Sequence, residues 1–177
     1  MRELTEIRWH ARAGQGAKTA AQLLALAALR GGKSVQAFPE YGPERRGAPL
    51  RAFTRISDRP IRRHDSITDP DVVVVLEPSL IHEVDVCEGL ARDGVVLINA
   101  EEPPAELDGA NVECVPAGTL ARGSSFVNVV MLGAVAGRLL GAPSLESLQD
   151  AAVELLGAKA GADAVRAAVA EGYAWRG

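Results

Sequence analysis

The chain has 177 residues, a mass of 18.6 kDa and a formal net charge of −4 at pH 7, which suits one domain with a hydrophobic core. Hydrophobic residues make up 47% of the sequence and are mostly Ala, Val and Leu, whereas aromatic residues make up only 4%. Such an aliphatic composition is typical of helices that pack on a buried sheet. The longest apolar runs are too short to cross a membrane, and the charged N-terminal residues do not resemble a signal peptide.

The cysteine and histidine content excludes several kinds of site. Cys87 and Cys114 do not form a CxxC pair, and two thiols are too few for a disulfide framework or a cysteine-ligated iron–sulfur cluster. His10, His64 and His82 are scattered and have no paired carboxylate, so we expect no metal site in this chain. Unpaired cysteines agree with the reducing cytoplasm, which is the location that we expect.

Arginine is unevenly distributed along the chain. Seven arginines fall between residues 45 and 63, and only Glu44 and Asp58 oppose them in that window. A basic stretch on an acidic protein indicates one particular anionic partner. No pattern of stacking aromatic residues accompanies it, so we do not expect binding to RNA or DNA.

The first third of the chain alternates strand and helix patterns. Residues 4–10 (LTEIRWH) predict a strand, and residues 16–30 predict a helix with Ala and Leu along one face. The glycine pair at 31–32 is expected to end this helix, because glycine is common just past a helix C-terminus. A short strand at 34–38 follows, and then a loop rich in Pro, Gly and Arg at 39–49.

Two kinds of strand are predicted in the middle of the chain. Residues 50–57 alternate between apolar and polar side chains, which predicts a half-exposed strand near a sheet edge. Residues 72–76 are apolar throughout and predict a central parallel strand, and 95–98 and 112–115 repeat this pattern. The last third predicts helices at 128–140, 144–156 and 161–173, with Ser144 as the N-cap of the middle one.

Together these patterns predict a single α/β domain over residues 1–177. The alternation of strands and helices indicates a Rossmann-like three-layer fold with a mainly parallel central sheet and a helical C-terminal third.

The turn between the first strand and the first helix is the first candidate site. Gly14, Gln15 and Gly16 would let backbone N–H groups approach an anion at the positive end of the helix, with Lys18 and Thr19 beside them. The turn is not a P-loop, because no glycine directly precedes the lysine, and it lacks the third glycine of a dinucleotide fingerprint. A tight turn that serves packing alone is an equally good interpretation.

The second candidate is the loop that contains Arg45 and Arg46. Two arginines in a loop bounded by Pro and Gly can hold a phosphate or carboxylate bidentately, although ordinary surface arginines would give the same pattern. The third candidate is Asn128, which either caps the helix at 128–140 or presents its amide to a ligand at the same end of the sheet. No catalytic triad or Cys–His pair can be assembled, so the sequence predicts binding without catalytic residues of its own.

Two long motifs resemble one known family. Residues 9–16 read WHARAGQG and residues 36–49 read QAFPEYGPERRGAP, and RAFTRISD at 51–58 and NVVMLGA at 128–134 continue the similarity. The chain resembles the gamma subunit of 2-oxoacid:ferredoxin oxidoreductases, most closely the pyruvate synthase type. Ala13 stands where the family usually has glycine, which affects only how freely the turn bends.

The resemblance implies a role in a larger enzyme that converts pyruvate, coenzyme A and oxidised ferredoxin to acetyl-CoA, CO2 and reduced ferredoxin, or the reverse. It implies thiamine diphosphate on alpha and beta subunits and 4Fe-4S clusters on a ferredoxin-like delta subunit, so the isolated chain is expected to be inactive. Coenzyme A is then the expected ligand of the predicted binding residues, which are Gly14, Gln15, Gly16, Lys18, Thr19, Asn128, Arg45 and Arg46.

Other interpretations stay open. A 2-oxoglutarate or branched-chain oxoacid version of the enzyme would need little change in this chain. An independent NAD-binding enzyme is another alternative, in which Glu40 would hold a ribose hydroxyl after the second strand. A purely structural subunit is the third, and in both subunit interpretations the arginines at 45 and 46 could dock against partner subunits.

Overall fold

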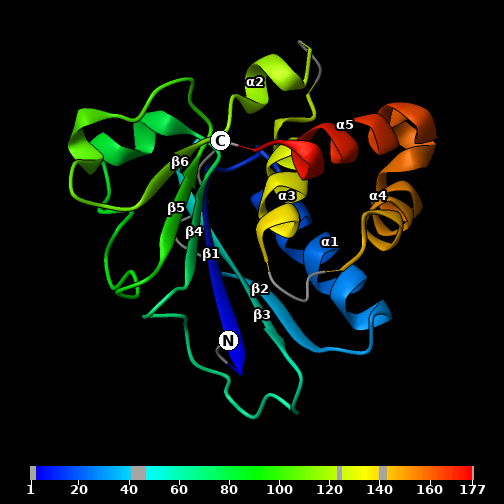
Figure 1. Ribbon diagram of the computed structural model, residues 1–177, viewed down its shortest axis with the longest axis horizontal. Coiled ribbons are helices and arrows are strands. Elements are labelled where there is room, and N and C mark those ends of the chain that lie inside the picture. The colour runs from blue at the N-terminus through cyan, green and yellow to red at the C-terminus, as the bar shows by residue number, and fades with distance from the viewer. Residues whose placement is uncertain (1–2, 41–46, 123–124, 140–142, 177) are drawn as a thin grey trace.

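The computed structural model describes residues 3–40, 47–122, 125–139 and 143–176. Within these ranges six strands form one sheet in the order β2-β3-β1-β4-β5-β6 (Figure 1). In chain order they are β1 (Leu4–Arg12), β2 (Ser34–Glu40), β3 (Pro49–Ser57), β4 (Val72–Val75), β5 (Val95–Ile98) and β6 (Val112–Cys114). The six predicted strands are confirmed, with bounds that differ by a few residues at most.

Strand direction follows the length of the connections. The parallel set consists of β1, β4, β5 and β6, while β3 runs antiparallel to both of its neighbours, β1 and β2. Parallel neighbours need long crossover connections, whereas β2 and β3 are joined by residues 41–48 alone, which is too short for one. The prediction of a mainly parallel sheet is therefore confirmed, with β3 reversed.

Helices pack on one face of the sheet. The helices packed together on that side are α1 (Ala17–Arg30), α3 (Val127–Arg138), α4 (Leu145–Ala160) and α5 (Ala162–Ala174) (Figure 1). The short helix α2 (Ala117–Leu120) leads from β6 back toward them. The other face carries two 3-10 turns, η1 (Pro78–His82) and η2 (Ala105–Leu107), together with loops. The predicted three layers are present, and the second outer layer is thin.

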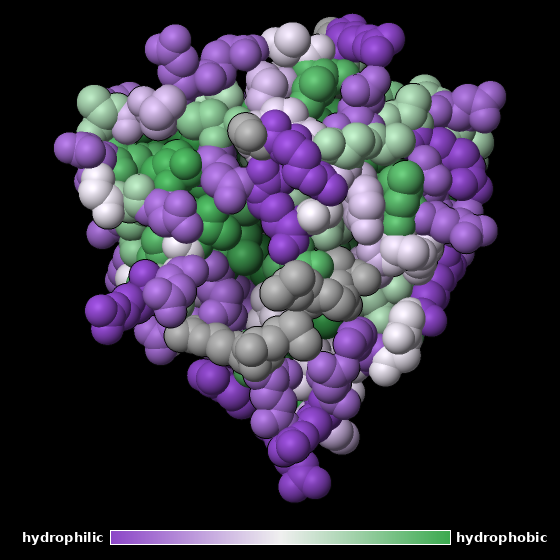
Figure 2. Space-filling view, viewed as in Figure 1, coloured by the Kyte–Doolittle hydropathy of each residue, from purple (hydrophilic) through white to green (hydrophobic). Residues whose placement is uncertain are grey.

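The two faces bury different amounts of apolar surface. The helix-covered face holds the main core, in which Trp9, Leu24 and Leu132 are fully buried. The other face holds a small cluster around Val73, Val75 and Ile98, between β4, β5 and the 3-10 turns. Hydrophobic residues reach the surface beside β6, which is the edge strand at the opposite end of the sheet from β2 (Figure 2). The helical layer therefore supplies most of the hydrophobic stabilisation.

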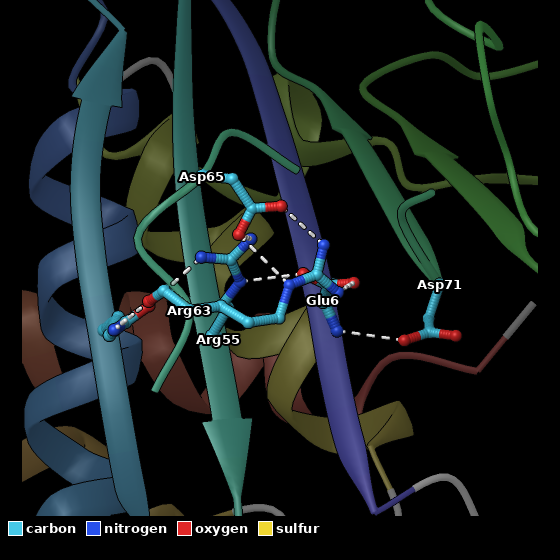
Figure 3. Close-up of polar contacts among 6 residues, drawn as sticks. Glu6, Arg55, Arg63, Asp65 and Asp71 are labelled. Carbon is cyan, nitrogen blue, oxygen red and sulfur yellow. Dashed lines mark hydrogen bonds and ion pairs between the residues drawn. The ribbon is translucent and has the colours of Figure 1, made fainter. Parts of the chain in front are cut away.

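The prediction of a half-exposed β3 is wrong. Phe53 and Arg55 are 1% and 0% exposed, although they lie on the face without helices. Figure 3 shows the reason: Arg55 reaches across to Glu6 on β1, and Arg63 and Asp65 from the following loop close over them. Alternation marks two different faces, but here ion pairs and a loop bury the polar one. The edge strand beside β3 is β2, and all of its residues are half-buried.

Both predicted helix signals are confirmed. Helix α1 ends at Arg30, and Gly32 follows it with a φ of +81°, a conformation that glycine adopts readily. Ser144 caps α4, because its hydroxyl accepts a hydrogen bond of 3.2 Å from the backbone N–H of Ser147. None of the helices in the described ranges is long and apolar enough to cross a bilayer.

Candidate functional site

The turn between β1 and α1 depends on its glycines. Gly14 and Gly16 have φ angles of 100° and 82°, in the left-handed region that other residues rarely adopt. The backbone N–H of Gln15 donates to the carbonyl of Arg12 at 3.0 Å, which tightens the turn. The chain thus passes directly from the end of β1 into the first turn of α1.

The N-terminus of α1 is left open by this arrangement. Gly16 occupies the N-cap position and has no side chain to accept a hydrogen bond, and the first turn contains no acidic residue. The first backbone N–H groups of a helix have no partner within the helix, and they carry partial positive charge. This end of α1 is therefore suited to an anion.

Asn128 packs directly against the glycine turn. It lies in the first turn of α3, and its Nδ2 donates to the carbonyl oxygen of Gly16 at 3.4 Å. A Cβ atom at position 16 would come within 2.5 Å of that Nδ2. The N-cap position of α3 is Phe126, so the predicted capping role of Asn128 is wrong. Its predicted contact with a ligand stays a prediction.

A cavity of about 750 Å³, here called the glycine-turn cavity, opens at this position. It lies where β1, β4 and β5 end and where α1 and α3 begin, which is where α/β folds commonly bind ligands. Five of the predicted site residues line it: Gly14, Gln15, Gly16, Thr19 and Asn128. Lys18 is exposed and is not part of the lining, and Arg45 and Arg46 lie outside the described residues.

Three further polar residues of the cavity were missed from the sequence. Lys159 comes from the C-terminal end of α4, and its sequence context is that of an ordinary surface lysine. Glu77 and Asn99 follow β4 and β5 closely. Their positions after parallel strands were a usable signal, because the carboxyl ends of such strands meet at one edge of the sheet.

Gln15 and Glu77 hold the turn in place. The Oε1 of Gln15 accepts from the backbone N–H of Arg12 at 2.7 Å, and its Nε2 donates to Glu77 at 2.7 Å. Burial acts to raise the pKa of Glu77, but hydrogen bonds from Gln15 and Ser79 outweigh it and lower the pKa below its ordinary value. Glu77 is therefore a carboxylate whose hydrogen bonds fix the shape of the cavity wall.

Other polar groups in the cavity remain available. Both ends of the Asn99 amide already have partners, because its Nδ2 donates to the carbonyl of Leu76 at 3.1 Å and its Oδ1 accepts from the N–H of Gly118 at 3.1 Å. By contrast, the hydroxyl of Thr19 and the ammonium of Lys159 have no hydrogen-bond or ion-pair partner in the described part of the chain. A hydroxyl, a cation and an open helix N-terminus together suit an anionic ligand with further polar groups.

The histidines do not contribute to this cavity. His10 is buried on the other face of the sheet, where its Nε2 accepts a hydrogen bond of 3.1 Å from the Nε of Arg8. Burial, together with the charges of Arg8 and Arg51, lowers the pKa of His10 to about 3, so the ring is neutral near pH 7. His64 and His82 are exposed, and the described ranges contain no group of three potential metal ligands.

Comparison with known proteins gives consistent relatives. Residues 6–175 match the family described as pyruvate ferredoxin/flavodoxin oxidoreductase. The chain is 46% identical over 174 residues to the common gamma subunit of pyruvate/ketoisovalerate oxidoreductases of Thermococcus kodakarensis, covering 93% of this chain and 94% of that protein. It is 50% identical over 148 residues to the pyruvate synthase subunit PorC of Methanothermobacter marburgensis, covering 82% of each. The crystal structure of the pyruvate oxidoreductase subunit PORC of Thermotoga maritima superimposes with a TM-score of 0.82 and 39% identity, over 97% of this chain and 96% of that one.

Proposed function

The chain belongs to the pyruvate ferredoxin/flavodoxin oxidoreductase family, as a subunit of a multi-subunit oxidoreductase, and we propose that its glycine-turn cavity binds coenzyme A. The observation that carries this proposal is the open N-terminus of α1, which faces a cavity where Lys159 is a cation without an acidic partner among the described residues. Coenzyme A combines phosphate groups with an amide-containing arm, so it needs both kinds of contact that the cavity offers.

The contacts divide by chemistry. The N–H groups of α1, Thr19 and Lys159 would hold a phosphate group, because a helix N-terminus and a cation both favour negative charge. The amide oxygen of Asn128, which has no hydrogen-bond partner in the described part of the chain, would accept from an N–H group of the ligand. Lys18 is exposed beside the cavity and would add to the positive field without contact.

Two alternatives remain for the arginine loop. Arg45 and Arg46 would either add charge for coenzyme A or dock against a partner subunit. A double substitution to alanine separates these roles: loss of affinity for coenzyme A in an intact complex supports the first, and loss of subunit association supports the second.

Partner subunits would carry the chemistry that this chain does not. We propose thiamine diphosphate on alpha and beta subunits and 4Fe-4S clusters on a delta subunit, with ferredoxin as the electron acceptor of the complex. The presence of only Cys87 and Cys114 supports this division, because one such cluster takes four cysteines.

Pyruvate is the oxoacid that we propose for the complex, with branched-chain oxoacids and 2-oxoglutarate as alternatives. The name of the Thermococcus relative, a gamma subunit common to pyruvate and ketoisovalerate oxidoreductases, supports a gamma subunit that does not choose the oxoacid. Turnover of the purified complex with pyruvate, ketoisovalerate and 2-oxoglutarate would identify the substrate. A preference for pyruvate is the expected result.

An independent NAD-binding enzyme is disfavoured by the position of Glu40. In a dinucleotide site the acidic residue lies at the end of the second strand, which is the direct neighbour in the sheet of the strand that leads into the glycine turn. Here β3 lies between β1 and β2, and Glu40 pairs with Arg51 on the face without helices. Titration of the chain with NAD is expected to show no binding.

The test of coenzyme A binding uses the complex assembled with its partner subunits. Gly16→Ala should raise the dissociation constant for coenzyme A about tenfold or more, because the new Cβ strains the left-handed turn and displaces Asn128. Isothermal titration calorimetry without oxoacid measures this directly. The KM for the oxoacid should stay unchanged.

Gly32→Ala is the matched control. Gly32 has nearly the same φ, +81° against +82°, but lies at the opposite end of α1 with open space around it. It should leave the affinity for coenzyme A unchanged. If Gly16→Ala also binds like the unaltered complex, the cavity does not bind coenzyme A and a purely structural subunit is favoured.

A further inference from the structure

The face of the sheet without helices contains a second hollow, of about 530 Å³. It lies over the ends of β1, β2 and β3 and beside the loop that follows η1, and it shares no residue with the glycine-turn cavity. Its polar residues are His10, Glu40, Arg51, Asp85 and Glu88, and no part of the proposed function uses them. We call it the β-face hollow.

His10 presents a hydrogen-bond donor to this hollow. The residue is 3% exposed, and its Nε2 accepts from the Nε of Arg8, which can only donate. The ring proton of the neutral histidine is therefore on Nδ1. Among the described residues Nδ1 has no hydrogen-bond partner. It is also not one of the fully buried side-chain atoms that lack such a partner, which among these residues are Arg55 Nη2 and Arg138 Nη1, so Nδ1 stays accessible. Water can reach this donor, so a partner that displaces the water from the hollow must supply an acceptor in its place, since an unmet buried donor is costly.

The charges around the hollow call for a cation as well. Arg51 pairs with Glu40 and lies 3.9 Å from a carboxylate oxygen of Glu88. Asp85 and Glu88 are both exposed, and the side chain of Glu88 is 71% exposed. Three carboxylates against Arg51 leave the lining with a net charge of −2, which the buried guanidinium of Arg8 behind His10 reduces to −1. A ligand that fits must thus offer a hydrogen-bond acceptor and positive charge together.

The surrounding segment is strongly acidic. Residues 77–108 contain nine Asp and Glu and a single Arg, a net charge of −8, whereas the whole chain carries −4, so the remainder carries +4. All of these acids except Glu77 are exposed. A field of one sign over a surface accelerates and orients the approach of a partner of opposite sign.

We infer that the β-face hollow receives a basic segment of another subunit of the oxidoreductase, with a backbone carbonyl accepting from His10 Nδ1 and a Lys or Arg side chain between Asp85 and Glu88. A peptide chain carries both required groups, since every residue has a carbonyl and a basic side chain adds the charge. A simple cation would leave the His10 donor unmatched. Membership in a multi-subunit enzyme supplies the partner chains.

The test is subunit retention in the co-expressed complex. A tag on another subunit captures the complex, and the amount of this chain that stays bound is measured at increasing salt. Asp85→Lys/Glu88→Lys should lower retention about tenfold or more at physiological salt, because it reverses both exposed charges of the hollow. The unaltered chain should lose retention gradually as salt increases.

Asp150→Lys/Glu154→Lys is the matched control. Both residues are exposed acids on α4, in surface ion pairs with Arg166 and Arg30, and the substitution changes the net charge equally. Retention of this control should equal that of the unaltered chain. If the two double variants are retained alike, whether both stay bound or both are lost, the inference is wrong.

A substitution at His10 tests the hydrogen bond separately. His10→Gln can accept from Arg8 and still donate into the hollow, so it should keep most of the retention. His10→Met can do neither and should lose it. Equal retention of the two variants would overturn the assigned role of His10.

Discussion

The two faces of β1 and β3 are built from opposite chemistry. Toward the helices these strands present Ile7, Trp9 and Ala52, which are fully buried in an aliphatic core. Toward the loops they present Arg8 and Arg55, which are just as buried but are held by hydrogen bonds and ion pairs. These residues of the two faces are therefore equally buried, and what differs is whether each side chain needs a specific partner.

That difference decides how each face should respond to change. An apolar side chain loses packing in proportion to the area and volume removed. A buried charge depends on its counter-ion, and removal of one member leaves the other without compensation. The helix face should therefore be sensitive to volume, and the loop face to the loss of a partner.

The largest effect is expected from Arg55→Met. Arg55 is fully buried, its Nε lies 2.7 Å from Glu6, and its Nη1 donates to Gln36 at 3.1 Å. Its removal leaves the carboxylate of Glu6, 10% exposed, without its buried counter-ion. The free energy of unfolding should fall by about 3–5 kcal/mol, measured by chemical denaturation.

A double substitution tests whether the loss comes from the unpaired charge of Glu6. Arg55→Met/Glu6→Gln removes both charges, so it should recover part of the stability lost in the single variant. A double variant that is less stable than Arg55→Met would show that the charges themselves stabilise this face.

On the helix face the corresponding sensitive position is Gly172. A Cβ atom there would come within 1.9 Å of the backbone carbonyl oxygen of Val130, where α5 crosses α3. Gly172→Ala should lower the free energy of unfolding by about 3 kcal/mol, because neither backbone can yield without separating the helices. The melting temperature measures the effect.

Gly118→Ala is the control for helix propensity. Gly118 lies in α2, and the nearest atom that its new Cβ would meet is 4.0 Å away. It should be neutral or slightly stabilising, since alanine favours a helix over glycine. Equal destabilisation by the two substitutions would contradict the argument from close packing.

The loop face should also be the pH-sensitive one, through His10. Its pKa is about 3 in the folded chain against an ordinary value of 6.5, so the folded state binds fewer protons between these values. The contribution of neutral His10 to the free energy of unfolding is therefore fully present above about pH 6.5 and is lost as the pH falls toward 3. By linkage His10 should account for about 2 kcal/mol of loss at pH 5.

His10→Gln supplies the comparison for this pH dependence. It keeps an acceptor for Arg8 but has no titrating ring, so its unfolding free energy should fall less between pH 8 and pH 5. Parallel pH profiles of the two proteins would contradict the assignment to His10.

Much of the fold follows from patterns of local sequence. The valine run of β4 could only be buried on both faces, and Gly32 and Ser144 mark helix ends with recognisable chemistry. The burial of β3 could not be predicted, because it depends on Glu6, 49 residues away, and on the loop that carries Arg63. Alternation alone does not distinguish a solvated polar face from a paired one.

The site divides in the same way. Gly14 and Gly16 were identifiable because a left-handed turn before a helix needs glycine. Asn128 was found as a candidate, but its contact with the carbonyl of Gly16 spans 112 residues and follows from the packing of α3 on α1. Lys159 carried no local signal at all, since only the tertiary fold brings the end of α4 to the cavity.

The smallest effect is expected from Arg63→Met, in the same network as Arg55. Its guanidinium lies 2.6 Å from Asp65 and 3.7 Å from Glu6, but its side chain is 50% exposed. Because water can replace these contacts, the unfolding free energy should fall by less than about 1 kcal/mol, and the difference should shrink at about 1 M salt. The hydrogen bond from Arg63 holds the pKa of Asp65 down to about 2, so NMR titration should show that pKa rising toward 3.8 in the variant. A loss as large as that of Arg55→Met would mean that the number of charges, and not their burial, decides the stability of this face.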